Sequence, residues 1–189
     1  MGRPRILVDL DNVVYDWTRS MANWLYHNKA TQTVPPRLME QYGQWAVWED
    51  WGIPEGEFMR WWRLGIEEGV IYGKGPIVPG ARNALWQLSD AEWDIQICTN
   101  RLTKFGLHDQ IVYNTVSWLK DNAIPYRGLL FTADKKQVLA EAIVDDREDN
   151  THKTMHDQVF VFPTNHNQGR PVLPSEQKEF WQNIVNVLT

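Results

Sequence analysis

Five short apolar runs, each about as long as a β-strand, recur along the 189-residue chain and limit its fold class most. Each is rich in β-branched or aromatic residues and is followed by polar residues or proline, a pattern typical of buried strands. The runs are Ile6-Leu7-Val8, Ile95-Gln96-Ile97-Cys98, Leu129-Leu130-Phe131, Ala142-Ile143-Val144 and Val159-Phe160-Val161-Phe162.

Segments with helical spacing lie between and after these runs. Apolar residues three and four apart predict helices near residues 81–88 and 111–119, and Val138 and Leu139 after Asp134 indicate another. A closing helix is expected from Ser175 as N-cap, with a buried face of Phe180, Trp181, Ile184, Val185 and Leu188. Alternating strands and helices predict an α/β fold with a doubly wound, Rossmann-like parallel sheet covered on both faces.

One interval, residues 17–78, is much longer than an ordinary crossover connection. It contains an expected helix from residue 18 to about 27, a Pro35-Pro36 break, and an amphipathic run with apolar residues from 58 to 66. The simplest arrangement is a small helical cap inserted after the first strand. We therefore expect a core domain of residues 1–16 and 79–189 and a cap subdomain of residues 17–78.

Composition narrows the classes of partner. The formal net charge of -5 disfavours stable binding to nucleic acid, which depends on many Lys and Arg contacts with phosphates. A small anionic substrate remains compatible with this charge, because a local site can be positive on an acidic protein. Cys98 is the only cysteine, so an intramolecular disulfide and a cysteine-based zinc site are excluded. The apolar start is short and interrupted by aspartates, which predicts no membrane contact and a cytoplasmic location.

Asp9 and Asp11 directly follow the first apolar run. Side chains two apart on a strand point the same way, so both carboxylates can converge beyond the carboxyl edge of the sheet, where open α/β folds bind ligands. Aspartates at strand ends also cap turns, which is the simpler interpretation of this pair alone.

Three more polar groups follow the next three runs, namely Thr99-Asn100-Arg101, Asp134-Lys135-Lys136 and Asp145-Asp146. Each has an ordinary structural explanation as a helix cap, a solvated cation or a turn. The carboxyl ends of parallel strands meet at one edge, however, so all four groups would gather there. Their joint occurrence favours a common site.

The order of an Asp-x-Asp pair, a threonine, a lysine and an Asp-Asp pair resembles the four motifs of haloacid dehalogenase-type phosphatases. More narrowly, Thr132-Ala133-Asp134-Lys135, Asp145-Asp146-Arg147 and Val78-Pro79-Gly80-Ala81 resemble the 5'(3')-deoxyribonucleotidases. The chain departs from that subfamily at Asn12, where glycine is frequent, and at Asn100-Arg101, where serine and proline are usual.

The resemblance implies a Mg²⁺-dependent phosphomonoester hydrolase in which Asp9 attacks phosphorus and forms an aspartyl-phosphate. Asp11 would be the general acid and base, and Lys135 would neutralise phosphate charge. The implied metal ligands are Asp9, the Asp11 carbonyl and Asp146, while Asp145 either holds a coordinated water or orients Lys135. Thr99 and Asn100 would hold phosphoryl oxygens, and Arg101 either joins them or is a solvated cation. The family also makes a homodimer plausible.

The cap interval concentrates five of the eleven tryptophans between residues 45 and 62. Trp45 and Trp48 are predicted to line a base pocket, because bases stack on aromatic rings, while Phe58, Trp61 and Ile66 suit the core of the cap. The expected substrate is therefore a (deoxy)nucleoside monophosphate. The alternatives are a phosphatase of nucleic-acid 3' ends or of another small phosphate ester, and a non-catalytic binding module on the same fold.

Overall fold

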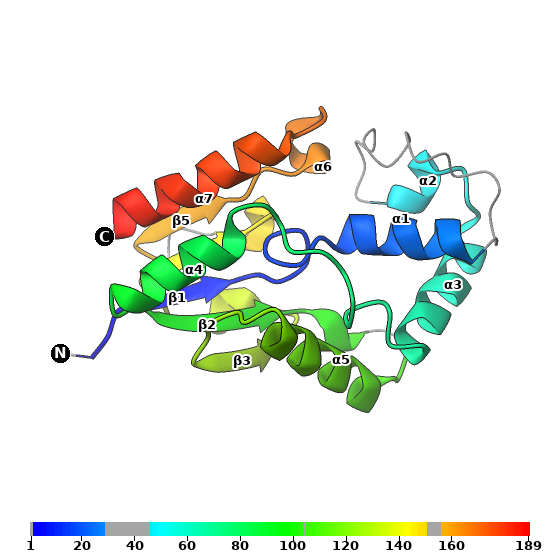
Figure 1. Cartoon of the computed structure of the whole chain (residues 1–189), viewed down its shortest axis with the longest axis horizontal. Helices are drawn as coiled ribbons and strands as arrows, with labels where there is room; N and C mark the ends of the chain where they lie inside the picture. Colours follow the sequence, from blue (N-terminus) through cyan, green and yellow to red (C-terminus); the bar gives the residue numbers. More distant parts are fainter. Residues whose placement is uncertain (1, 29–45, 104, 151–155) are drawn as a thin grey trace.

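A computed structural model describes residues 2–28, 46–103, 105–150 and 156–189 (Figure 1). Five parallel strands form one sheet in the order β3-β2-β1-β4-β5. They are β1 (Arg5–Val8), β2 (Asp94–Thr99), β3 (Gly128–Phe131), β4 (Ala142–Asp145) and β5 (Gln158–Val161). Each corresponds to one expected apolar run, and the predicted α/β fold class is confirmed. Because β1 is central, the residues that follow it lie at the middle of the carboxyl edge.

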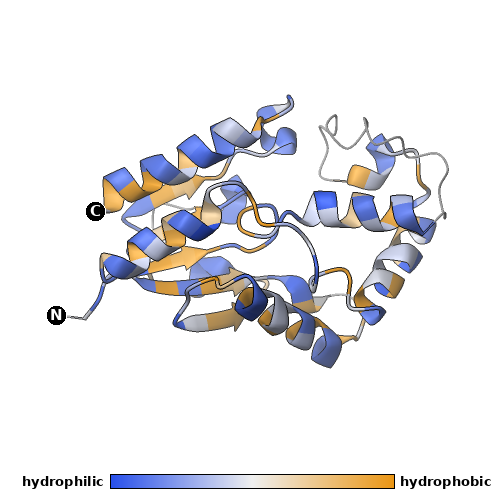
Figure 2. Cartoon of the chain, in the orientation of Figure 1, coloured by the Kyte–Doolittle hydropathy of each residue, from blue (hydrophilic) through white to orange (hydrophobic). Residues whose placement is uncertain are grey.

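Three helices cover one face of this sheet. Apolar residues of α4 (Ala81–Asp90), α5 (His108–Asp121) and α7 (Pro174–Leu188) join a single cluster with Ile6 and Val8 of β1. Figure 2 shows the strands as mainly hydrophobic and the helices as mixed in polarity, as expected for helices with one buried side. Ser175, the predicted N-cap of α7, lies in the first turn instead, because Leu173 is the N-cap and Pro174 occupies the first helical position.

The opposite face buries Leu7, Cys98 and Ile143, and among the described residues Val138 and Ala140 pack on it. The helix expected around Val138 and Leu139 is absent. A short 3-10 turn, η3 (Lys135–Gln137), is followed by extended Val138, and Leu139 is 68% exposed. Residues 132–141 must return from β3 past two strands to β4, and a helix rises only about 1.5 Å per residue, so an extended path is required.

The cap carries α1 (Trp17–His27), α2 (Val47–Asp50) and α3 (Glu55–Glu67). The predicted helix from residue 18 and the predicted amphipathic run are therefore confirmed, while Pro35-Pro36 lies outside the described residues. Figure 1 places these helices at one end of the molecule and both termini at the other. Asp16 is the N-cap of α1, and its carboxylate accepts a hydrogen bond from the Arg19 amide.

The cap is joined to the sheet by a two-stranded stem. The Asp16 amide donates to the Pro76 carbonyl, and the Val78 amide donates to the Val14 carbonyl, both at 2.9 Å. One hydrophobic cluster continues from the sheet through the stem to Phe58 in the cap. The division at residues 16/17 and 78/79 thus falls at the stem, and it stays a proposal about domain organisation.

None of the helices in the described part of the chain combines the length and the apolar character needed to cross a bilayer.

Candidate active site

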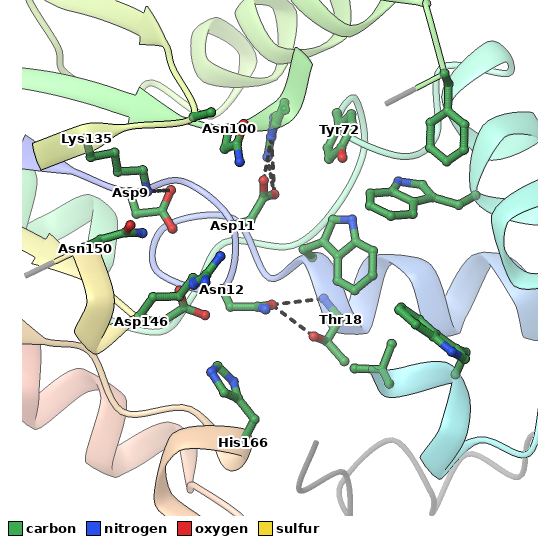
Figure 3. Close-up of a pocket in the computed structure, with 18 residues that line it drawn as sticks. Asp9, Asp11, Asn12, Thr18, Tyr72, Asn100, Lys135, Asp146, Asn150 and His166 are labelled. Carbon is green, nitrogen blue, oxygen red and sulfur yellow. Dashed lines mark hydrogen bonds and ion pairs between the residues drawn. The ribbon is translucent and has the colours of Figure 1, made fainter. Parts of the chain in front are cut away.

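A cavity of about 290 Å³ opens between the carboxyl edge of the sheet and the cap (Figure 3). Its floor contains charged side chains that follow four different strands, and its walls are mostly aromatic side chains of the cap and its stem. Among the residues predicted from the sequence, the cavity is lined by Asp9, Asp11, Asn100, Arg101, Lys135, Asp146 and Trp48.

Lys135 joins two carboxylates under this floor. Its Nζ lies 2.6 Å from Asp9 Oδ1 and 2.6 Å from Asp145 Oδ2, and its side chain is only 4% exposed. The 3-10 turn η3 directs Lys135 inward, with the Asp134 carboxylate accepting from the Lys136 amide at the start of that turn. Asp9 Oδ1 also accepts from the Leu10 amide at 2.7 Å. The carboxylate predicted as the nucleophile is therefore held in one orientation.

The two aspartates after β4 have different environments. Asp145 is fully buried, and both of its oxygens accept hydrogen bonds, Oδ2 from Lys135 and Oδ1 from the Arg147 amide. Asn150 in the turn η4 (Glu148–Asn150) donates to both oxygens at 3.1 Å. Asp146 lines the cavity, and its Oδ2 is buried without a hydrogen-bond partner among the described residues.

Asp9, Asp145 and Asp146 could together hold a metal ion, since one oxygen of each lies within 4.8 Å of the others. Burial raises the pKa of Asp9 to about 7, and it raises that of Asp146 well above its usual range, with repulsion from neighbouring carboxylates adding to both effects. Burial alone would lower the pKa of Lys135, but Asp9 and Asp145 raise it overall. One lysine thus faces three carboxylates, and a bound cation would offset the remaining negative charge.

Asp11 is held from the other side of the floor by Arg101. Arg101 Nη2 donates to Asp11 Oδ1 at 2.7 Å, and Nε lies 3.2 Å from Oδ1 and 3.0 Å from Oδ2. Arg101 begins the 3-10 turn η2 (Arg101–Thr103), directly after β2. Arg101 was predicted either to contact phosphate or to be solvated. It is instead buried and paired with Asp11, the predicted general acid.

Thr99 is the last residue of β2, and Asn100 follows it. Thr99 is 1% exposed, and within the described part of the chain its Oγ1 has no hydrogen-bond partner. Asn100 is exposed and lines the cavity. A buried hydroxyl without a partner, next to an exposed amide, is suited to an anionic oxygen that enters the cavity.

The cap and its stem supply the aromatic walls. Trp48 from α2 lines the cavity, as the sequence predicts, and Trp45 lies outside the described residues. Phe58 and Ile66 are fully buried in the core of the cap, as expected, and Trp61 packs on Trp24 with ring centroids 5.7 Å apart. The other apolar or aromatic lining residues, which the sequence did not single out for the pocket, are Trp17, Val47, Trp62, Tyr72, Phe105 and Ala133.

Several polar lining residues were also not predicted. Asn12 adopts a left-handed conformation (φ 60°), and its Oδ1 accepts from the amide and hydroxyl of Thr18, both at 3.1 Å. Glycine and asparagine tolerate this conformation best. Asn12, at a position where the related subfamily frequently has glycine, was therefore a local signal for this turn. His166 also lines the cavity, from the short helix α6 (Asn165–Gln168).

His166 is a titratable side chain of the cavity with a shifted pKa. Burial lowers the pKa of His166, and nearby Arg147 lowers it further. Its Nδ1 lies 2.7 Å from the hydroxyl of Thr164, the N-cap of α6. The sequence offered no periodic signal for so short a helix.

Comparisons with known proteins agree with this geometry. The family model for "5' nucleotidase, deoxy (Pyrimidine), cytosolic type C protein" matches residues 3–188. A protein of Chlorobaculum tepidum named "Putative 5'(3')-deoxyribonucleotidase" is 27% identical over 186 residues, which cover 96% of this chain and 88% of that protein.

Solved structures show the same fold at low identity. The Bacillus subtilis protein named "putative HAD-hydrolase YfnB", crystallised bound to magnesium, has a TM-score of 0.59 at 16% identity, with 100% of both chains covered. A hydrolase from Streptococcus pneumoniae has a TM-score of 0.55 at 13% identity, with 89% of this chain and 97% of that chain covered. The resemblance inferred from the motifs is confirmed, and the chain belongs to the 5' nucleotidase, deoxy (Pyrimidine), cytosolic type C family, as a nucleotidase of the haloacid dehalogenase type.

Proposed function

We propose that this enzyme hydrolyses (deoxy)nucleoside monophosphates with Mg²⁺, using Asp9 as the nucleophile. The observation that carries the proposal is the position of Asp9. Its carboxylate is held by Lys135 near Asp146, whose Oδ2 has no partner among the described residues, at the base of a cavity with aromatic walls.

The donor set fits Mg²⁺, which prefers oxygen ligands and keeps several waters. Asp9 and Asp146 would be the carboxylate ligands, and the Asp11 carbonyl would be a third. Asp145 would orient Lys135, because Lys135, Asn150 and the Arg147 amide already use its oxygens. When bound, Mg²⁺ supplies positive charge that reduces the repulsion between a phosphate dianion and an anionic nucleophile.

The protein groups then divide the reaction into two steps. Asp9 forms a bond to phosphorus while the bond to the leaving oxygen breaks, and Asp11 gives a proton to that oxygen. In the second step Asp11 takes a proton from the attacking water, phosphate leaves, and the Asp9 carboxylate is restored. Lys135, the Thr99 hydroxyl and Asn100 would stabilise the charge on the phosphoryl oxygens.

The aromatic walls support a nucleoside as the leaving group. A base stacked on an aromatic side chain gains about 1–3 kcal/mol in the single-stranded systems where this is measured. The volume of about 290 Å³ is close to the lower end of the range of roughly 300–1,000 Å³ for small-molecule sites, which favours a mononucleotide over a nucleic-acid end. The acidic net charge of -5 points the same way. A cytoplasmic location and a homodimer stay predictions from the sequence.

A phosphate-release screen tests the proposal directly. Purified enzyme would be assayed on nucleoside 5'- and 3'-monophosphates, a sugar phosphate and a 3'-phosphorylated oligonucleotide, with Mg²⁺ or with EDTA, and Asp9→Asn would be the control. We expect Mg²⁺-dependent release from at least one mononucleotide. Release from the sugar phosphate or oligonucleotide alone would refute the substrate, and undiminished release in EDTA would refute the metal requirement.

A further inference from the structure

Arg101 is a buried side chain of the cavity floor that is bonded on several sides. Its side chain is 0% exposed, and its guanidinium donates to Asp11 through Nε and Nη2. Its Nη1 donates to Thr115 Oγ1 at 2.9 Å. The Thr115 hydroxyl itself donates to the Ile111 carbonyl at 2.7 Å, so it presents a lone pair to Arg101.

Two tyrosine rings pack against the same guanidinium. Its central carbon lies 4.2 Å from the ring centroid of Tyr72 and 4.8 Å from that of Tyr15. Both are within the distance at which a cation is attracted to an aromatic face. Tyr15 precedes α1 and Tyr72 lies in the returning segment, so both sides of the cap stem contact Arg101.

The tyrosines are themselves fixed by the stem. The Tyr15 hydroxyl lies 2.6 Å from Ser20 Oγ and accepts from the Tyr72 amide at 2.9 Å. Gly75 allows the Tyr15 ring to pack closely, because a Cβ at that position would lie 2.4 Å from ring atoms. Arg101 therefore has little freedom to turn away from Asp11.

We propose that Arg101 is a positioning residue, whose fixed guanidinium orients the Asp11 carboxylate for proton exchange with the leaving oxygen. This inference rests on the proposed phosphatase function. It goes beyond a phosphate-binding or solvated role for Arg101, because its guanidinium contacts Asp11, Thr115 and the two rings.

The geometry at Asp11 leaves room for this proton exchange. Oδ1 accepts from both Nε and Nη2, whereas Oδ2 has a single contact with Nε at 3.0 Å. A carboxylate oxygen has two lone-pair sites, so Oδ2 keeps one of them. The Asp11 side chain is 28% exposed and lines the cavity, where that site can meet a leaving oxygen.

The test uses the quality of the leaving group. Loss of a positioned general acid slows release of an alkoxide, which needs a proton, far more than release of p-nitrophenolate, which needs little help. We expect Arg101→Gln to lower kcat on thymidine 5'-monophosphate by about 10- to 100-fold, and kcat on p-nitrophenyl phosphate by less than about threefold. Equal losses on both substrates would overturn the proposal.

A double-mutant cycle tests whether Arg101 acts through Asp11. Asp11→Asn should show the same preference for p-nitrophenyl phosphate, and adding Arg101→Gln to it should cause no further loss of kcat on thymidine 5'-monophosphate. A double variant clearly slower than Asp11→Asn alone would assign Arg101 an independent role and contradict the inference.

Thr115→Val is a second, milder variant that tests the same role if Arg101→Gln does not fold. It removes one hydrogen bond of Arg101 and preserves side-chain volume and charge. We expect the same leaving-group pattern with a smaller loss on thymidine 5'-monophosphate, about threefold to tenfold. A uniform loss on both substrates in folded Thr115→Val would count against the positioning role.

Failure of the proposed function would look different from failure of this inference. If wild-type enzyme cleaves neither substrate with Mg²⁺, the phosphatase proposal fails. If it cleaves only p-nitrophenyl phosphate, the nucleotide assignment fails, and phenyl phosphate replaces the nucleotide as the poorer leaving group in the same comparison. If wild-type enzyme cleaves both and Arg101→Gln does not distinguish them, only the positioning role is refuted.

Discussion

The floor and the walls of the cavity are built on different principles. The floor holds few groups, and its reactive carboxylates are oriented by charged partners, Asp9 by Lys135 and Asp11 by Arg101. The walls are aromatic side chains that pack on one another and on the core of the cap, with ring centroids 5.1 Å apart for Trp17 and Trp62 and 5.3 Å apart for Trp48 and the core residue Phe58. We infer that the floor determines which bond is broken and the walls determine which leaving group is accepted.

The difference predicts how each region responds to substitution. A charged group on the floor cannot be replaced without leaving a buried partner uncompensated. An aromatic wall residue contributes contact area and stacking, so its loss should have a graded effect on binding. The predictions that follow test this contrast.

Asp9→Asn should have the largest effect, because it removes the nucleophile and leaves the floor otherwise similar in shape. We expect kcat on any accepted phosphate ester to fall by about 10⁴-fold or more. Steady-state phosphate release, with substrate binding measured separately by calorimetry, checks this. A variant that retains a tenth of the wild-type kcat would place the nucleophile elsewhere.

Asp146→Asn and Asp145→Asn form a matched pair within the floor. Asp146→Asn should raise the Mg²⁺ concentration for half-maximal activity by about 10- to 100-fold, because it weakens a direct ligand. Asp145→Asn should mainly lower kcat, because it releases Lys135, which Asp145 contacts at 2.6 Å. Mg²⁺ titrations of activity separate the two, and the reverse pattern would exchange their proposed roles.

Trp48→Ala tests whether the aromatic walls select the leaving group. We expect kcat/KM for the preferred nucleoside monophosphate to fall by roughly 5- to 100-fold through a raised KM, while p-nitrophenyl phosphate is little affected. Trp61→Ala is the control, since Trp61 packs on Trp24 and does not line the cavity. An equal loss in kcat/KM for both substrates in Trp48→Ala would argue against selective base stacking.

The pH dependence of stability tests the burial of charge on the floor without a substitution. Burial raises the pKa of Asp9 from 3.8 to about 7 in the metal-free protein. Between these values the folded state holds a proton that the unfolded chain has lost, so the free energy of unfolding should fall as pH rises from about 4 to 7. We expect a decrease of about 3 kcal/mol by pH 7, since the shift spans about three pKa units of about 1.4 kcal/mol each and its last part is lost only above pH 7.

Urea unfolding in EDTA at several pH values measures this decrease. Asp9→Asn should flatten the dependence, although the raised pKa of Asp146 acts in the same direction. Added Mg²⁺ should stabilise the wild-type protein more at pH 7 than at pH 5, because a cation favours the charged carboxylates. An unfolding free energy that rises from pH 4 to 7 in EDTA would contradict the assigned direction.

The sequence predicted the floor better than the walls, for a physical reason. Apolar runs identify strands, and the carboxyl ends of parallel strands meet at one edge, so Asp9, Lys135 and Asp146 could be grouped without knowing any contact. The pairing of Arg101 with Asp11 could not be predicted this way, because it depends on how Tyr15 and Tyr72 of the cap segment pack around the guanidinium.

Predictions from local sequence patterns were also wrong where the strand order of the sheet determines the path of the chain. A helix was expected around Val138 and Leu139, but their segment must pass two strands, and Val138 is extended. Tyr72 and His166 reach the cavity from a returning loop and a four-residue helix, which carry no periodic signal. Residues that reach the cavity only through the tertiary fold can be identified only from the structure.

The most direct test of the account is to trap the intermediate on Asp9. Wild-type enzyme turning over p-nitrophenyl phosphate with Mg²⁺ would be quenched in acid through the first turnover, reduced with borohydride and mapped by peptide mass spectrometry. Borohydride converts an aspartyl-phosphate to homoserine, and the account predicts homoserine at position 9. Homoserine at another aspartate, or at none while phosphate is released, would contradict it.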